Sequence, residues 1–473
     1  MRLQKTLCAL ALGALTCRHP NTPAPMADAP PMAPPPVAAT ARDAGGGPSA
    51  GVGAGARALE TLADTLSARM ATLRGLALRR PIPRGVMSRA QIVARLRERT
   101  RQEYPGAEIT LEGELQKRLG LLPESMDYEA TVFALLEEQV LGFYDPLEQR
   151  LYIADWVPAE AQASTMAHEL THALQDQHFN IGRFTHHQQG GNDAQLAAMS
   201  VVEGDATAAM MDFAMRAAGR TLRDLQDPDA LLRGQLQATA DQPRLAAAPA
   251  ALRDTLLFPY LQGFSLCARI VRADGDYHAI NDLLATPPAS TEQVLHADKL
   301  AAREPPIAVP PTVPAALARD FQLAYHDVEG ELGLRLFLQT ALPVPRADSG
   351  AAGWGGDHAV LLVPNGSLRP LDAGVELSPE ALARDVLLWT VTMDPVTGAA
   401  TDAQATEFAA GAQAVLAHRY PQAPVVSVPG AMVARVVSPG RVSLVARSGR
   451  TVLVGDRVPQ DRAALVVRQV LAR

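Results

Sequence analysis

The sequence predicts an α+β protein that is mostly helical, with a small sheet in the first half of the chain and an α/β region at the C-terminal end. Apolar residues recur at helical spacing in many segments, whereas strand-like runs are short and gather late in the chain. Hydrophobic residues make up 48% of the 473 residues, enough for a sizeable core. Aromatic residues make up only 4%, so this core must consist of Ala, Leu, Val and Met.

The expected elements follow from local spacing, composition and turn residues. The expected helices are 57–76, 88–103, 111–122, 128–141, 164–179, 193–218, 258–271, 321–342 and 402–418. The expected strands are 151–153, 359–363, 387–393, 433–437, 442–446 and 452–454. Residues 353–358 are expected to form a tight turn, and they are no phosphate-binding loop because no Gly-Lys-Ser/Thr follows.

The composition excludes two classes of protein. The formal net charge is −7, whereas a nucleic-acid-binding protein needs a basic face, so no nucleic-acid partner is expected. The three cysteines, Cys8, Cys17 and Cys267, are too few for a disulfide-stabilised scaffold.

The first 17 residues have the layout of a secretory signal peptide. Two basic residues precede an apolar run of about ten residues, which is too short for a permanent membrane anchor. The run ends in a segment that resembles a bacterial lipoprotein cleavage site, with Cys17 as the lipidated residue, although Ala14 and Thr16 depart from the usual pattern. We expect an exported protein, either an outer-membrane or cell-surface lipoprotein or a secreted protein; a chance apolar start is the third alternative.

Composition divides the rest of the chain into three parts. Residues 18–56 are rich in Pro, Ala and Gly, cannot bury a core and are expected to be a disordered tether. Residues 57–310 are expected to form the main domain, and 311–473 a C-terminal α/β region that either stands apart or continues the same unit. No other apolar run is long enough to cross a membrane, so membrane contact is expected only through a lipid on Cys17.

The most informative segment is the expected helix 164–179, which contains the sequence His-Glu-Leu-Thr-His. His168 and His172 are four residues apart and therefore lie on one face, at a separation that suits two nitrogens on one metal ion. Glu169 is rotated by about 100° from His168 and can reach a water molecule held by that metal. This is the H-E-x-x-H arrangement of zinc hydrolases. The alternative is two polar residues on a solvated helix face.

A hairpin is expected directly before this helix, with a turn at Asp145-Pro146 and a strand through 151–153. A strand edge beside a metal-binding helix can pair with an extended substrate, but a purely structural hairpin explains the pattern equally well. Pro158 is expected in the first turn of the helix.

A second informative stretch, Glu203-Gly204-Asp205, interrupts the very apolar segment 193–218. A carboxylate in such a helix is costly to bury without a partner, and a glycine inside a helix often marks close backbone approach. A metal ion would explain both features, so Glu203 is expected to be the third zinc ligand; the alternative is an exposed Glu. Asp205 and Asp176 are candidates to hydrogen-bond the ligand histidines.

One further histidine, His296, is a candidate catalytic residue. The adjacent Ser290 and Gln293 have the spacing of a helix capping box, which accounts for that stretch without any function. His296 itself is either a second electrophile of the site or a surface histidine, and Tyr277 is the alternative electrophile.

Taken together, HELTH and the downstream Glu203-Gly204-Asp205 resemble the gluzincin branch of the zincin metallopeptidases. The set GFYDP, HELTHALQDQHF, VEGDA, PPASTEQVLH and GWGGD resembles bacterial predicted zinc-peptidase lipoproteins, in patches across 57–473. The resemblance implies a zincin-like core in 57–310, one Zn²⁺ ion held by His168, His172 and Glu203, and Glu169 as the base. The interval between His172 and Glu203 is longer than in thermolysin-like peptidases, and no downstream histidine of that type aligns.

The expected reaction is zinc-dependent hydrolysis of peptide bonds in a polypeptide substrate. Zinc lowers the pKa of its water towards about 7, and Glu169 accepts the proton and passes it to the leaving amine. The rivals are a non-catalytic zinc-binding envelope lipoprotein and a zinc hydrolase of cell-wall amide bonds.

Overall fold

The computed structural model describes residues 49–156, 159–185, 190–228, 230, 242–371, 374–378, 380–395 and 402–472. The signal peptide 1–17, most of the expected tether and Pro158 lie outside the described residues. Helix α2 begins at Ser49, so residues 49–56 extend a helix where a disordered tether was expected. The alanines of this stretch are strong helix formers and continue the helix that 57–74 forms.

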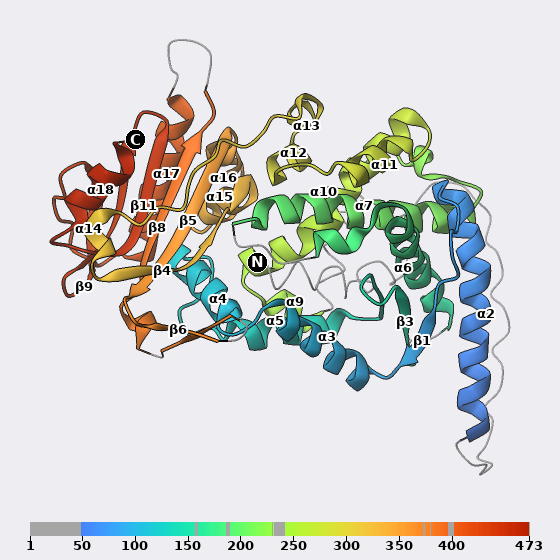
Figure 1. Ribbon diagram of the computed structural model, residues 1–473. Helices are drawn as coiled ribbons and strands as arrows, with labels where there is room; N and C mark the ends of the chain where they lie inside the picture. Colours follow the sequence, from blue (N-terminus) through green and yellow to red (C-terminus); the bar gives the residue numbers. More distant parts are fainter. Residues whose placement is uncertain are drawn as a thin grey trace.

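Most described elements of the first part are helices, and the described strands of the whole chain form three sheets, of three, six and two strands (Figure 1). The first part contains α2 (Ser49–Arg74), β1 (Arg84–Met87), α3 (Arg89–Glu103), α4 (Glu108–Leu119), α5 (Tyr128–Gln139), β2 (Gly142–Asp145), β3 (Arg150–Ala154), α6 (Ala159–Phe179), η1 (Ile181–Phe184), α7 (Asn192–Arg216), η2 (Leu222–Asp224), α9 (Pro243–Ala247), α10 (Ala250–Asp274), α11 (His278–Ala285), α12 (Thr291–Leu295) and α13 (Ala297–Ala302). The second part contains α14 (Ala315–Ala318), β4 (Phe321–Asp327), α15 (Gly330–Gln339), α16 (Val344–Ala351), β5 (Trp354–Pro364), β6 (Leu368–Pro370), β7 (Val375–Leu377), η4 (Ala381–Ala383), β8 (Val386–Met393), α17 (Ala403–Arg419), β9 (Ala431–Ser438), β10 (Arg441–Ser448), β11 (Thr451–Pro459) and α18 (Ala463–Leu471). This architecture confirms the predicted α+β class.

The expected hairpin before the motif helix is present. Strands β2 and β3 pair antiparallel, from Gly142 opposite Ile153 to Asp145 opposite Arg150. Strand β1 adds to β3 in parallel, which gives the order β1-β3-β2 and leaves β2 at one edge. Helix α6 packs against β2, so the small sheet supports the helix that carries the motif.

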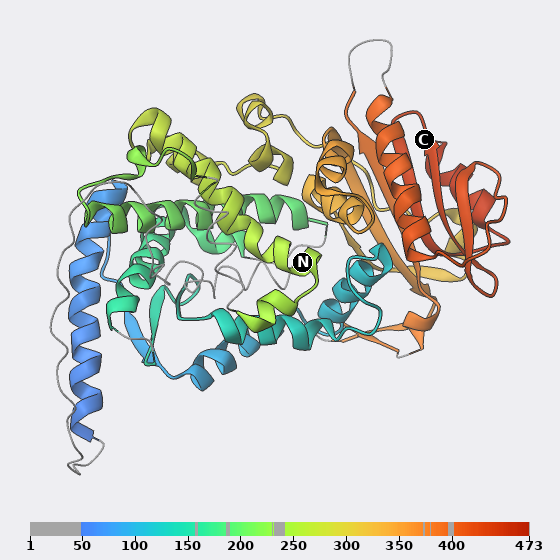
Figure 2. The same cartoon turned by 180° about the vertical axis from the view of Figure 1, so that it is seen from behind.

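The C-terminal region is built on a six-stranded antiparallel sheet with the order β4-β5-β8-β11-β10-β9. Side chains alternate between its two faces: Leu361 packs with α15, α16 and α17, whereas Leu362 packs with α14 and α18. Figure 2 shows α17 lying along one face of the sheet. Burial on both faces explains why its strands read as continuous apolar runs.

Two local predictions in this region were wrong. The segment 321–342 was expected to be one helix, but 321–327 is strand β4 and only 330–339 is helical, because β4 finds its hydrogen-bond partners in β5. The expected tight turn at 353–358 is instead the start of β5 at Trp354. Glycine in this stretch allows the backbone at Ile307 to lie directly against the strand, because a Cβ on Gly356 would lie 2.0 Å from the carbonyl oxygen of Ile307.

Buried polar contacts join the two parts of the chain. Arg118 on α4 donates to Asp385 before β8 at 2.8 Å, and both side chains are buried. Gln116 on the same helix donates to Glu329 at the start of α15 at 3.1 Å. The C-terminal sheet is therefore packed against the first part. Among the described helices, none combines the length and the apolar composition that crossing a membrane requires.

The closest helix crossing in the first part joins α7 to α10 at two glycines. A Cβ on Gly204 would lie 2.2 Å from the carbonyl of Gly263, and a Cβ on Gly263 would lie 2.0 Å from the carbonyl oxygen of Ser200. Neither position can hold a side chain without moving a helix. Gly204 therefore marks a close backbone approach, as expected, but the approaching element is α10 rather than a metal ion.

We predict that Gly263→Ala lowers the free energy of unfolding by about 2–3 kcal/mol, because the added methyl group forces α7 and α10 apart. Urea denaturation measures the change. Gly182→Ala is the matched control, since its Cβ would meet the nearest atom of another residue at an ordinary 3.5 Å. Equal stability of the two variants would contradict the close crossing.

Candidate metal centre

Helix α6 positions the two histidines inside the protein rather than on a solvated face. Its sequence is rich in Ala and Gln and also contains Leu, Glu and Met, all favourable in helices. Its apolar residues Ala167, Leu170 and Leu174 belong to the main core. His168 and His172 are only 2% and 3% exposed, which excludes the alternative of a solvated helix face.

Glu203 approaches the two histidines from α7, which packs beside α6. Its side chain is fully buried, so the alternative of an exposed Glu is excluded. The backbone of α7 continues through Glu203 and Gly204, as the predicted helix 193–218 requires. Gly204, the residue after Glu203, packs directly against Gly263 of α10. This contact holds the backbone of α7 in place and so sets the position of the Glu203 carboxylate.

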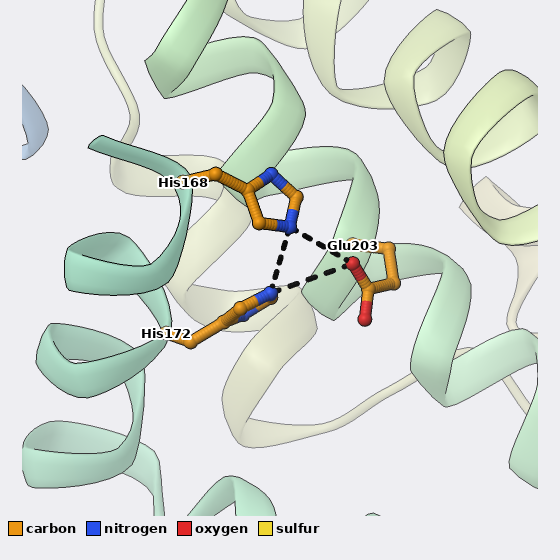
Figure 3. Close-up of side chains that lie close together, drawn as sticks. All are labelled: His168, His172 and Glu203. Carbon is orange, nitrogen blue, oxygen red and sulfur yellow. Dashed lines mark hydrogen bonds and ion pairs between the residues drawn. The ribbon is translucent and has the colours of Figure 1, made fainter. Parts of the chain in front are cut away.

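The three side chains converge on one point (Figure 3). The Nε2 atoms of His168 and His172 are 3.0 Å apart, and Oε2 of Glu203 lies 3.2 Å and 3.4 Å from them. Two atoms that each lie about 2.0–2.1 Å from a tetrahedral zinc ion are roughly 3.3 Å apart. The observed separations therefore match three corners of such a site.

An unpaired oxygen of the cluster also fits a metal ion. Within the described part of the chain, Oε1 of Glu203 is buried and has no hydrogen-bond partner. A buried carboxylate oxygen without a partner is unfavourable in a core this apolar. Two imidazoles and one carboxylate are the protein ligands that catalytic zinc sites of this type use, with a further position left open.

The orientation of His172 is fixed by Gln175, one turn further along α6. The Gln175 amide nitrogen donates to the carbonyl of Val202 at 3.0 Å and to Asp205 at 2.7 Å. Its carbonyl oxygen therefore faces Nδ1 of His172 at 2.9 Å and accepts a hydrogen bond from it. Because the proton is on Nδ1, the neutral ring presents the Nε2 lone pair to the metal position.

Asp205 extends this arrangement to a buried arginine. Its second oxygen accepts from Nε of Arg74 at 2.7 Å, and both side chains are fully buried. Arg74 also donates to Asn281 at 2.8 Å and stacks over the ring of Tyr277. Asp205, which was expected to contact a ligand histidine directly, thus acts through Gln175.

Glu169 is held at the edge of the small sheet. Its Oε2 accepts a hydrogen bond from the backbone N–H of Tyr144 on β2 at 2.8 Å. Strand β2 is an edge strand of the small sheet, and its Tyr144 amide bonds to Glu169. The hairpin that was considered for substrate pairing therefore positions the carboxylate of Glu169. Burial raises the pKa of Glu169, although the charges of His168 and His172 oppose the shift.

The histidines and the carboxylates of the cluster shift one another's pKa values. Burial alone would lower the pKa of His172, but Glu203 and Glu169 outweigh it and raise that pKa to about 9. Burial alone would raise the pKa of Glu203, but His172 and His168 outweigh it and lower that pKa to about 2. In the metal-free protein a proton on His172 therefore balances the charge of Glu203.

Three other predicted residues lie elsewhere. Asp176 accepts a hydrogen bond from the hydroxyl of Tyr144 at 2.9 Å, whereas the described partners of His172 are Gln175, His168 and Glu203. His296 pairs with Glu331 on α15 at 2.8 Å, and it belongs neither to the three-ligand cluster nor to the pocket beside it. Tyr277 lies under Arg74. The structure therefore gives no support to either His296 or Tyr277 as an electrophile of this site.

Sequence reasoning missed Gln175, Arg74 and the amide of Tyr144. Gln175 lies three residues after His172, a spacing that places the two side chains together on a helix and was available from the sequence. Arg74 is 131 residues from its partner Asp205, and the Tyr144 amide carries no sequence information at all.

A small enclosed space adjoins His172 and Glu203. It measures about 10 Å³ and is also lined by Tyr144, Pro146 and Ile181. This is about the volume that a single water molecule needs.

Comparisons with protein-family models, curated proteins and solved structures found no match to this chain.

We predict that zinc affinity rises about tenfold per pH unit between pH 6 and 8. The pKa of His172 near 9 means that the metal must displace a proton throughout this range, and this competition weakens as the pH rises. Competition with a chromophoric chelator measures the affinity. An affinity that does not change with pH would contradict this arrangement of charges.

We also predict that Gln175→Leu weakens zinc binding by about 10- to 100-fold, because His172 loses the acceptor that orients its ring. The matched control is Gln177→Leu on the same helix, since Gln177 bonds to Arg79 and Arg80 and not to a ligand. Equal zinc affinities of the two variants would show that Gln175 does not orient His172.

Proposed function

We propose that this chain is a zinc-dependent peptidase of the gluzincin type, exported and anchored to a bacterial membrane through a lipid on Cys17. One observation carries the proposal: two histidine nitrogens and a carboxylate oxygen lie within 3.4 Å of one another, and Glu169 follows the first ligand on the same helix. His168, His172 and Glu203 would hold the ion. Zinc, when bound, supplies Lewis-acid chemistry that activates water and polarises a carbonyl group.

Glu169 is the residue that moves the proton in this proposal. Its carboxylate accepts a proton from the attacking water and delivers it to the nitrogen of the leaving amine. The raised pKa of Glu169, caused by burial, makes the carboxylate a better proton acceptor than an exposed Glu. The Tyr144 amide holds one oxygen of Glu169, which keeps the side chain in one orientation.

A second candidate function, zinc binding without catalysis, is favoured by the burial of the site. Glu169 is 3% exposed and the adjoining space measures about 10 Å³, whereas peptide hydrolysis requires access for a polypeptide. A zinc hydrolase of cell-wall amide bonds is the third candidate and uses the same residues.

We predict that Glu169→Gln retains zinc with unchanged stoichiometry and loses hydrolysis by a factor of at least about 100, because the amide cannot accept the proton. Zinc content and cleavage of casein, a peptide library and muropeptides are measured in parallel. The control is Glu376→Gln in β7, whose side chain is exposed and pairs with Arg369.

The three candidates give different results in this experiment. Casein or peptide cleavage that disappears in Glu169→Gln supports the peptidase. Muropeptide cleavage alone supports the cell-wall enzyme. Zinc binding without any cleavage by the wild type supports the non-catalytic protein, and cleavage by Glu169→Gln at the wild-type rate contradicts Glu169 as the base.

A further inference from the structure

The small space beside the metal centre is closed on one side by segment 181–185, which comprises the 3₁₀ helix η1 and Thr185. Ile181 and Thr185 line this space together with His172 and Glu203, and both are buried. A space of about 10 Å³ holds one water molecule and excludes a polypeptide. Access to the metal centre therefore requires one wall of this space to move.

The walls contributed by α7 and β2 are held by regular structure. Met199 and Val202 lie inside α7, which packs closely against α10. Tyr144 lies in β2, which pairs with β3 along its whole length. The next residue, Asp145, forms a salt bridge with Arg99 at 2.8 Å. Movement of either wall would break core packing or the hydrogen bonds of the small sheet.

Segment 181–185 is held mainly by polar contacts. Within η1, Ile181 is buried but Phe184 is only half-buried. The backbone N–H groups of Ile181 and Gly182 donate to Asp176, and the amide nitrogen of Gln195 donates to the carbonyl of Phe184 at 2.8 Å. A segment with so little buried apolar surface opens at a lower free energy than a core helix or a paired strand.

Arg183 joins segment 181–185 to α11. Its side chain is exposed, and its Nη2 donates to the carbonyl oxygens of Leu284 and Ala285 at 2.8 Å and 2.9 Å. The residue before the segment, Asn180, has a left-handed backbone with a φ of 54°. Asn adopts this conformation at lower cost than most residues, so the chain can change direction between α6 and the segment.

The segment closes against the turn of the β2–β3 hairpin. A Cβ on Gly182 would lie 3.5 Å from the Cβ of Pro146 and 3.9 Å from Cδ2 of Leu147. Pro146 also lines the small space. The contact between Gly182 and Pro146 is therefore the place where segment and hairpin must separate to open this side.

We propose that segment 181–185 is a lid over the metal centre, seen here in its closed position, and that it separates from the hairpin turn at Pro146 to admit zinc and substrate. The proposal rests on the metal centre of the proposed function, but not on the reaction that follows. A lid controls the rates of both zinc uptake and zinc release and leaves the affinity nearly unchanged, because the ion passes the same opening in both directions.

The test is a disulfide bond between lid and hairpin, in the double variant Pro146→Cys/Gly182→Cys of the full chain. The Cβ separation at these positions lies within the range of disulfides. Zinc uptake, and zinc release to a chromophoric chelator, are measured in the oxidised protein and after reduction, and mass spectrometry identifies the bond. Oxidation slows both rates at least about tenfold and changes the affinity less than about threefold.

The matched control is the single variant Gly182→Cys, which changes the lid in the same way but has no partner at position 146. Its rates are the same before and after reduction. Equal rates of the oxidised and reduced double variant overturn the lid. Slower release with unchanged uptake also overturns it, because that result describes a more stable site rather than a closed entrance.

Cleavage of casein by the same samples separates the lid from the proposed peptidase. A peptidase loses cleavage on oxidation and regains it on reduction. Zinc exchange that depends on the disulfide, in a chain that cleaves nothing, supports the lid and contradicts the peptidase. A chain that binds no zinc contradicts the metal centre and overturns the lid with it.

Arg183→Ala tests the lid without a cross-link, in case the double variant does not fold. Loss of the hydrogen bonds to α11 favours opening and speeds both zinc uptake and zinc release about three- to tenfold. Arg346→Ala in α16 is the matched control, because this arginine is also exposed and lies in the C-terminal region. Equal rates in the two variants overturn the proposal.

Discussion

A fully buried carboxylate between two buried histidines is the constraint on which this structure depends. Glu203 is fully buried beside an apolar core of Ala, Leu, Val and Met with aromatic side chains such as Phe258 and Phe264, where an unpaired charge is strongly unfavourable. His168 and His172 approach it to within 3.4 Å and balance its charge with a proton or, in the proposed function, with a metal ion. Helices α6 and α7 must therefore keep one fixed arrangement, and α10 holds α7 in it through the contact between Gly204 and Gly263.

The supporting contacts extend outward from this cluster in two directions. On one side, Gln175 and Asp205 link His172 to the buried Arg74 and so tie α6 and α7 to α2. On the other side, the amide of Tyr144 links Glu169 to the small sheet. Both links use buried and directional hydrogen bonds, so a change at one end alters the orientation of a group at the other.

The sequence predicted the parts of this arrangement that depend on local spacing. Four-residue spacing placed His168 and His172 together, and a charged residue within an apolar helix singled out Glu203. The contacts made across large separations were not predictable: Gly204 meets Gly263, Arg74 meets Asp205, and strand β4 takes its partner from β5. For the same reason His296, a candidate by residue type alone, pairs with Glu331 instead of joining the site.

Anomalous diffraction at the zinc absorption edge, from crystals of the zinc-loaded chain, tests whether these three side chains hold a metal ion. We expect one zinc ion between α6 and α7, within about 2.0–2.2 Å of Nε2 of His168, Nε2 of His172 and an oxygen of Glu203. A zinc ion held by the two histidines without Glu203, or a zinc ion at another position in the chain, would contradict this expectation.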